Sequence, residues 1–200
     1  MYYHSTELKY VEYGKILPSP CPNSDWFPAY KWLGHYCGYC PQIWLSQCDV
    51  GMTGFRNEYA RRNDGILFGF DVVKGFGVDY ELWHFFLNYA LGSRNDTRHK
   101  TAPEVSEHVF QEICSLEREC ITDAVREGYE YTPLFSPDTE TVDGFLKRVF
   151  AGRDQYVVPS LNLKAAKKII CRNEKQKKIL RRMGFIEDRI KIMNVSTWKF

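Results

Sequence analysis

Four cysteines lie close together in the first quarter of the chain, at spacings that suit a metal ion or a redox pair. They are Cys21, Cys37, Cys40 and Cys48. Cys37 and Cys40 form a Cys-x-x-Cys pair with His35 nearby, and two thiolates at that spacing fit one edge of a tetrahedral zinc site. A second such pair is absent from the sequence, and Pro41 leads into a predicted strand, whereas a redox pair opens a helix. We predict isolated buried thiols and no metal site, with structural zinc and a redox dithiol left as alternatives.

Polar side chains on three predicted strands form a second, more widely spaced set. The segments are Tyr3-His4-Ser5-Thr6 near the start, Trp44-Leu45-Ser46 later, and Gln155-Tyr156-Val157-Val158-Pro159 near the end. Each polar side chain is flanked by apolar neighbours, as expected for strands of a buried sheet. One interpretation is purely structural, with His4 a half-buried histidine, Trp44 a core residue and Gln155 a strand-edge amide.

Taken in order, the three segments resemble the three motifs of ADP-ribosyltransferases of the diphtheria-toxin-like and poly-ADP-ribosylating branch. The resemblance covers residues 1–17, 42–73 and 145–193 and implies that NAD is the substrate. It implies that His4 contacts the adenosine ribose and the nicotinamide amide, that Trp44 stacks on nicotinamide, and that Gln155 contacts the nicotinamide ribose. By the same resemblance Ser46 supports the pocket, and the remaining residues of the first motif line it. These are Tyr3, Ser5 and Thr6.

The third motif departs from the family pattern at the position where the family has a glutamate. Breaking the nicotinamide–ribose bond passes through a transition state with oxocarbenium character, which requires orientation and electrostatic support. Gln155 can bind the ribose hydroxyl but supplies no charge. Asp154 supplies a carboxylate if the strand register shifts by one, although such a shift normally turns a side chain to the other face. A slow enzyme, an NAD-binding protein without turnover, and catalysis by Asp154 all stay open.

Three other residues extend the resemblance. Trp44 replaces the tyrosine usual at the stacking position, and its larger ring face suits the same contact. Arg153 precedes the third motif, where such enzymes select their acceptor, and it is equally compatible with a solvated turn. Arg56 follows Gly54 and could hold the pyrophosphate of NAD, although a helix-surface charge has the same sequence pattern.

Hydrophobic periodicity predicts the elements that position these residues. A strand at residues 1–6 leads into a short helix, and an irregular loop follows over Cys21–Pro41. Strands are expected at 42–46, 65–73, 155–158, 167–171 and 189–193, and helices at 79–91, 103–127, 139–149 and 174–183. Asn173 is the predicted N-cap of the last helix. The predicted fold is α+β, with a split, mostly antiparallel β core of ADP-ribosyltransferase type and a helical insertion at residues 79–135.

Charge divides the chain more sharply than its net value of +2 suggests. Residues 1–163 carry 15 basic and 22 acidic side chains, whereas residues 164–200 carry 12 and 3. The second segment is predicted to form a basic strand-helix-strand part. Such a part can bind nucleic acid or an acidic protein, and it can equally be a solvated face that balances an acidic body.

Composition restricts the class of protein. The 200 residues are 44% hydrophobic and 26% charged, which suits a single domain over 1–200 with a buried core. No apolar run approaches the roughly 20 residues that cross a bilayer, and the start lacks the features of a secretory signal. Seven cysteines, an odd number, favour reduced thiols. We therefore expect a cytoplasmic protein without a membrane partner.

The sequence lacks the glycine-rich signatures of dinucleotide-binding Rossmann domains and P-loop proteins, and the Gly-x-Ser-x-Gly of serine hydrolases. The leading hypothesis is an NAD-dependent ADP-ribosyltransferase that modifies a macromolecular acceptor, either protein or nucleic acid, docked by the basic part. The alternative is a non-enzymatic binding or inhibitor protein that uses its basic C-terminal face, with a zinc-stapled cysteine-rich loop as one variant.

Overall fold

The computed structural model describes residues 1–11, 14–16, 27–39, 43–47, 65–71, 73–79, 82–83 and 100–193. The chain divides into two compact units. The first comprises Met1–Ser19, Pro41–Phe76 and Asp154–Phe200, and the second comprises Pro20–Cys40 and Gly77–Arg153. The expected helical insertion at 79–135 falls within the second unit.

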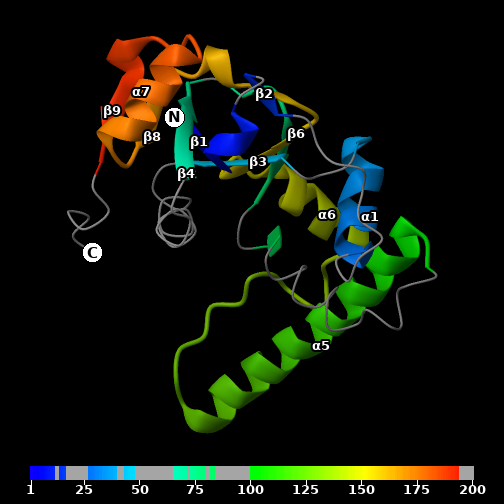
Figure 1. The fold of residues 1–200 in the computed structure, drawn as a ribbon. Coiled ribbons are helices and arrows are strands. Elements are labelled where there is room, and N and C mark those ends of the chain that lie inside the picture. The colour runs from blue at the N-terminus through cyan, green and yellow to red at the C-terminus, as the bar shows by residue number, and fades with distance from the viewer. Residues whose placement is uncertain are drawn as a thin grey trace. The chain divides into compact units, whose positions relative to one another are not determined.

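Strands of the described chain form a seven-stranded sheet in the order β5-β6-β3-β1-β4-β8-β9, and β2 pairs with β7 separately. Their bounds are β1 Tyr2–Glu7, β2 Lys15–Ile16, β3 Ile43–Gln47, β4 Gly65–Phe70, β5 Phe76–Val78, β6 Gln155–Val158, β7 Leu161–Asn162, β8 Lys168–Cys171 and β9 Ile190–Ile192. Short 3-10 turns lie at Leu8–Tyr10, Leu163–Ala165 and Glu187–Arg189. Figure 1 shows β1, β3, β4 and β6 side by side, although the chain visits them at widely separated positions.

The pairing in the large sheet is antiparallel from β6 to β8, and β8 and β9 run parallel. One face of this sheet carries the core of the first unit, where side chains of alternate residues meet: Ile43, Leu45, Ile66, Phe68, Phe70, Val158, Ile169 and Cys171. This alternation is the two-residue period of a strand, and it explains why β-branched and aromatic residues dominate these segments. The α+β class expected from the sequence is confirmed.

Helix α7, Glu174–Arg182, connects the parallel strands β8 and β9. The side chain of Asn173 accepts a hydrogen bond from the main-chain N of Gln176 at 2.9 Å, so the predicted N-cap is confirmed. Gly184 follows the helix with φ at +79°, a left-handed conformation that favours glycine. Leu180 is fully buried in the core of the first unit.

The second unit contains three helices in its described residues: α1 Phe27–Cys37, α5 Ala102–Glu127 and α6 Val142–Ala151. Helices α5 and α6 confirm predictions from the sequence. Of the predicted helix at 79–91 the structure describes Asp79, which is not helical, and Leu82 and Trp83, which are. Glu104 accepts from the main-chain N of Thr101 at 2.5 Å, which satisfies one free donor at the start of α5.

Helix α1 corrects the prediction of an irregular loop over Cys21–Pro41, which is wrong for Phe27–Cys37. Pro28 lies in the first turn, where its missing N–H is not needed. Trp32 and Leu33 are fully buried, and the Trp32 ring stacks on that of Trp83 at 5.7 Å between centroids. Tertiary packing therefore stabilises a helix that Gly34 weakens locally.

Within the described part of the chain, no helix combines the length and apolar character needed to cross a membrane.

Candidate functional site

The three strands that carry the motifs are direct neighbours in the sheet, in the order β6-β3-β1. Tyr3 pairs with Ser46, and Ser46 pairs with Gln155, so these three residues form one row across the strands. Residues directly opposite each other in antiparallel strands place their side chains on the same face. All three are buried, with 4%, 6% and 8% of their surfaces exposed. The fold therefore places one residue from each motif side by side on one sheet face, which we call the motif face.

Two further predicted residues lie on the motif face. Trp44 is two residues from Ser46 on β3 and pairs with Val157, so the period of the strand places its side chain on the same face. The Trp44 side chain is only half-buried. Ser5 lies two residues from Tyr3 on β1, and its buried Oγ has no hydrogen-bond partner among the described residues.

A buried hydroxyl without a partner is uncommon in folded proteins, where it costs about 1–3 kcal/mol. The Ser5 hydroxyl is thus the group on the motif face whose hydrogen-bonding capacity the described protein leaves unused. Such a group is suited to a bound ligand or an ordered water molecule.

His4 and Thr6 lie on the opposite face of β1, among the core of the first unit. His4 pairs with Phe68 and Thr6 pairs with Ile66, and both partners belong to that core. The His4 Nδ1 donates a hydrogen bond to the main-chain O of Trp44 at 2.8 Å. Because a carbonyl oxygen only accepts, this contact places a proton on Nδ1. The geometry thus separates His4 from the side chains of Trp44, Ser46 and Gln155, although all four lie on neighbouring strands.

The same alternation bears on the choice between Asp154 and Gln155. Gln155 pairs with Ser46 on the motif face, and Asp154 is the residue before it, where the main-chain O accepts from the N of Gln47 at 2.9 Å. A side chain one position earlier along a strand normally projects to the other face. The register therefore places the neutral amide, and not the carboxylate, in the row with Ser46.

Arg56 lies outside the described residues, and Arg153 is exposed after the end of α6. Among the four cysteines of the possible metal site, only Cys37 is described. Its thiol donates to the O of Tyr39 at 3.1 Å, and burial raises its pKa. A raised pKa favours the thiol over the thiolate that binds zinc or attacks disulfides. The residues that the structure describes include no group of three or more His, Cys, Asp or Glu side chains placed to hold a metal.

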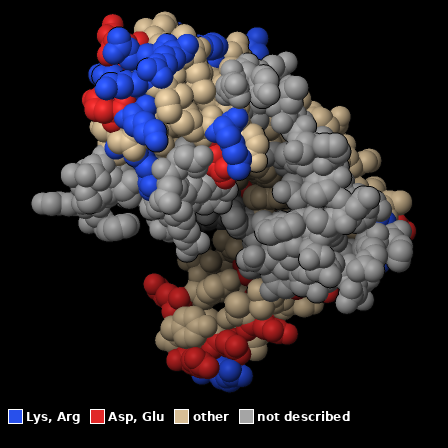
Figure 2. Space-filling view, in the orientation of Figure 1, with Lys and Arg blue, Asp and Glu red and all other residues tan. Residues whose placement is uncertain are grey.

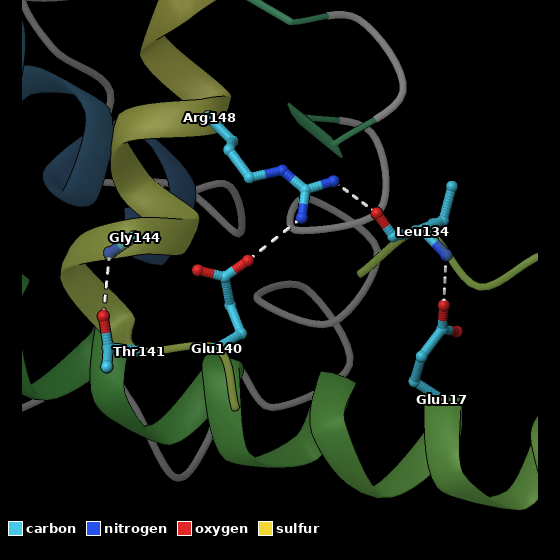
Figure 3. A network of polar contacts seen from close by, with 6 residues as sticks. All are labelled: Glu117, Leu134, Glu140, Thr141, Gly144 and Arg148. Carbon is cyan, nitrogen blue, oxygen red and sulfur yellow. Dashed lines mark hydrogen bonds and ion pairs between the residues drawn. The ribbon is translucent and has the colours of Figure 1, made fainter. Parts of the chain in front are cut away.

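Sequence reasoning missed a cluster of polar contacts in the second unit, of which the Glu117 side chain is the buried member (Figure 3). Glu117 on α5 is 1% exposed, and its carboxylate accepts from the main-chain N of Leu134 at 2.5 Å and from the Tyr131 hydroxyl at 2.7 Å. On α6, Arg148 donates to the O of Leu134 and to Glu140 at 3.0 Å. These contacts fasten the segment between α5 and α6 to both helices. This polar cluster has a structural role, because every residue in it belongs to that segment or to the helices on either side of the segment.

Comparisons of the chain with protein-family models, with curated proteins and with solved structures found no match.

Proposed function

We propose that the protein binds NAD on the motif face of the first unit and is an ADP-ribosyltransferase of low intrinsic activity. The observation that carries this proposal is the meeting of the three motif segments. Tyr3, Ser46 and Gln155 come from positions more than 40 and more than 100 residues apart, yet they form one buried row on neighbouring strands. A motif resemblance that depends on the order of three short segments is supported when the segments adjoin in space.

The chemistry on the motif face suits a nicotinamide nucleotide. The half-buried Trp44 offers an aromatic surface for stacking, and the Ser5 hydroxyl can bind an amide or a ribose hydroxyl. Pockets for such ligands combine apolar and aromatic walls with a few polar groups that fix orientation. His4 then acts through position, because its hydrogen bond to the O of Trp44 connects the first and second motif strands.

The expected rate of turnover follows from Gln155. Positive charge develops on the ribose as the bond to nicotinamide breaks, and a neutral amide stabilises that charge less than a carboxylate does. Asp154 immediately precedes Gln155, so its carboxylate lies outside the row formed by Ser46 and Gln155. We therefore expect measurable NAD binding together with slow release of nicotinamide.

The test is incubation of the purified protein with NAD labelled in the adenylate phosphate, with and without cell extract. Free nicotinamide and label on protein or nucleic acid are both followed. The Trp44→Ala variant should lose both signals, whereas Tyr156→Ala, a half-buried aromatic residue on the core face of β6, serves as the matched control. Equal signals from wild type and Trp44→Ala, or none from wild type, would overturn the proposal.

A further inference from the structure

One side of helix α7 packs into the core of the first unit. Leu180 is fully buried and Gln176 is 4% exposed. The Gln176 side-chain oxygen also accepts from the main-chain N of Arg172 at 2.7 Å, and Asn173 caps the helix. A helix fixed in this way presents its outward side chains from a rigid support.

The outward side of α7 carries a stripe of three exposed cations, Lys175, Lys178 and Arg182, which we call the basic stripe. Their spacing of three and four residues places them on one side of the helix, over about 10 Å at 1.5 Å per residue. Among the residues that the structure describes, none forms an ion pair with any of the three. Figure 2 shows Lys and Arg gathered over this part of the molecule.

Neighbouring acidic side chains are too few to neutralise the basic stripe. Residues 167–191 contain ten basic side chains and only three acidic ones. Glu187 is already engaged by Lys177 at 3.4 Å and Arg181 at 3.1 Å, on the flank of the helix. Glu174 lies one turn before Lys178 without forming an ion pair with it. The charge of the basic stripe is therefore available to a partner.

We propose that the basic stripe of α7 binds the phosphate backbone of nucleic acid. Lys and Arg side chains supply this kind of affinity without apolar contacts, because they release counterions from the phosphates. A protein partner would require an apolar centre, often aromatic, around which charges form the rim. Among the described residues of this part, the exposed large apolar side chains are Ile186 and Ile192, which are single side chains outside the stripe.

The test is fluorescence anisotropy with a labelled DNA duplex of about 20 base pairs, titrated over a series of KCl concentrations. The variant replaces Lys175, Lys178 and Arg182 with Gln. The matched control replaces Lys74, Lys147 and Arg126, which are exposed cations elsewhere, and so changes the net charge equally. Circular dichroism verifies that both variants fold, as expected for exposed positions.

The wild type should bind the duplex, and affinity should fall as salt rises. Three phosphate contacts contribute a slope of about −2.7 in log K against log salt, which corresponds to about a 40-fold loss between 50 and 200 mM KCl. The stripe variant should lose about that much slope, and the control should keep it. Equal weakening of both variants, no binding by the wild type, or displacement of the duplex by poly-glutamate at equal charge concentration would overturn the proposal. The outcome of this binding experiment does not depend on whether the protein binds or cleaves NAD, because no residue of the motif face is changed.

Discussion

His4 donates from its Nδ1 to the main-chain O of Trp44 at 2.8 Å, where the pairing of β1 with β3 ends. These two strands pair at Tyr2 with Gln47 and at Tyr3 with Ser46. Beyond these pairs the hydrogen bond to β3 comes from the imidazole of His4 and not from the main chain of β1. His4 therefore connects two motif strands from the core side, while the side chain of Trp44 lies on the opposite face.

Replacing His4 tests this positioning role. We expect His4→Ala to lower the free energy of unfolding by about 1–3 kcal/mol, because it removes the hydrogen bond and leaves the partly buried main-chain O of Trp44 without that donor. Affinity for NAD should fall with it, as Trp44 loses its support. His4→Gln, which keeps a donor, should restore part of both quantities. Urea denaturation and NAD titration measure them, and a fully stable His4→Ala variant that binds no NAD would instead indicate direct contact.

Removing the Ser5 hydroxyl should change stability and binding in opposite directions. Ser5→Ala removes a buried Oγ that lacks a partner, so the unliganded protein should become more stable by about 1 kcal/mol. Binding of NAD should weaken by about 10-fold, the equivalent of one lost hydrogen bond. Thr6→Val on the core face is the control and should leave NAD affinity unchanged. An unaltered NAD affinity in Ser5→Ala would remove this hydroxyl from the proposed site.

Exchanging the amide at position 155 for a carboxylate should raise turnover. Gln155→Glu places a negative charge in the row with Ser46, where it can stabilise the developing charge on the ribose. We expect nicotinamide release to increase by about 10- to 100-fold, with a lower melting temperature because a carboxylate is costly to bury. Gln155→Ala supplies the control and should release less nicotinamide than wild type. Equal rates in all three proteins would contradict the assigned role.

The contact between Tyr131 and Glu117 predicts how stability varies at high pH. Burial and the hydrogen bond to Glu117 raise the pKa of Tyr131. The unfolded chain releases this proton near the ordinary tyrosine pKa of about 10, whereas the folded protein retains it. The stabilisation is therefore complete below about pH 10 and is lost as the pH rises further.

The Tyr131→Phe variant should accordingly be less stable than wild type at about pH 8, by roughly 1 kcal/mol, and should decline less between about pH 10 and 11. Urea midpoints at a series of pH values measure both effects. Tyr129→Phe is the control, because Tyr129 is 50% exposed and its replacement should leave the wild-type curve unchanged. Parallel curves for wild type and Tyr131→Phe would refute the linkage.

The local sequence pattern predicts most strands and helices of the described chain. It does not predict how the residues of the site are arranged. The apolar run of Gln155–Val158 gave the exact bounds of β6, and Asn173 marked the start of α7. Helix α1 was missed because Pro28 and Gly34 obscure its period, and burial of Trp32 by distant residues is what stabilises it. Alternation predicts that His4 and Ser5 face opposite sides of β1. Only the register with β3 shows which of them shares a face with Ser46.

The burial of Glu117 is a second feature that the sequence pattern does not predict. Helix α5 contains several glutamates, and their spacing alone does not distinguish the buried one. The distinguishing contacts come from Tyr131 and Leu134, in the segment that follows the helix. A buried carboxylate held by a neighbouring segment is thus a property of tertiary structure, and composition gives no sign of it.

Binding of NAD tests the central claim most directly, because it does not depend on turnover or on knowledge of the acceptor. The measurement is the melting temperature of the wild type and of Trp44→Ala across a series of NAD concentrations. A ligand at 100 times its dissociation constant stabilises the folded state by about 2.7 kcal/mol, which is a readily measured shift. We predict a saturable rise for wild type that is lost in Trp44→Ala. A melting temperature that does not change with NAD in the wild type would contradict an NAD site on the motif face.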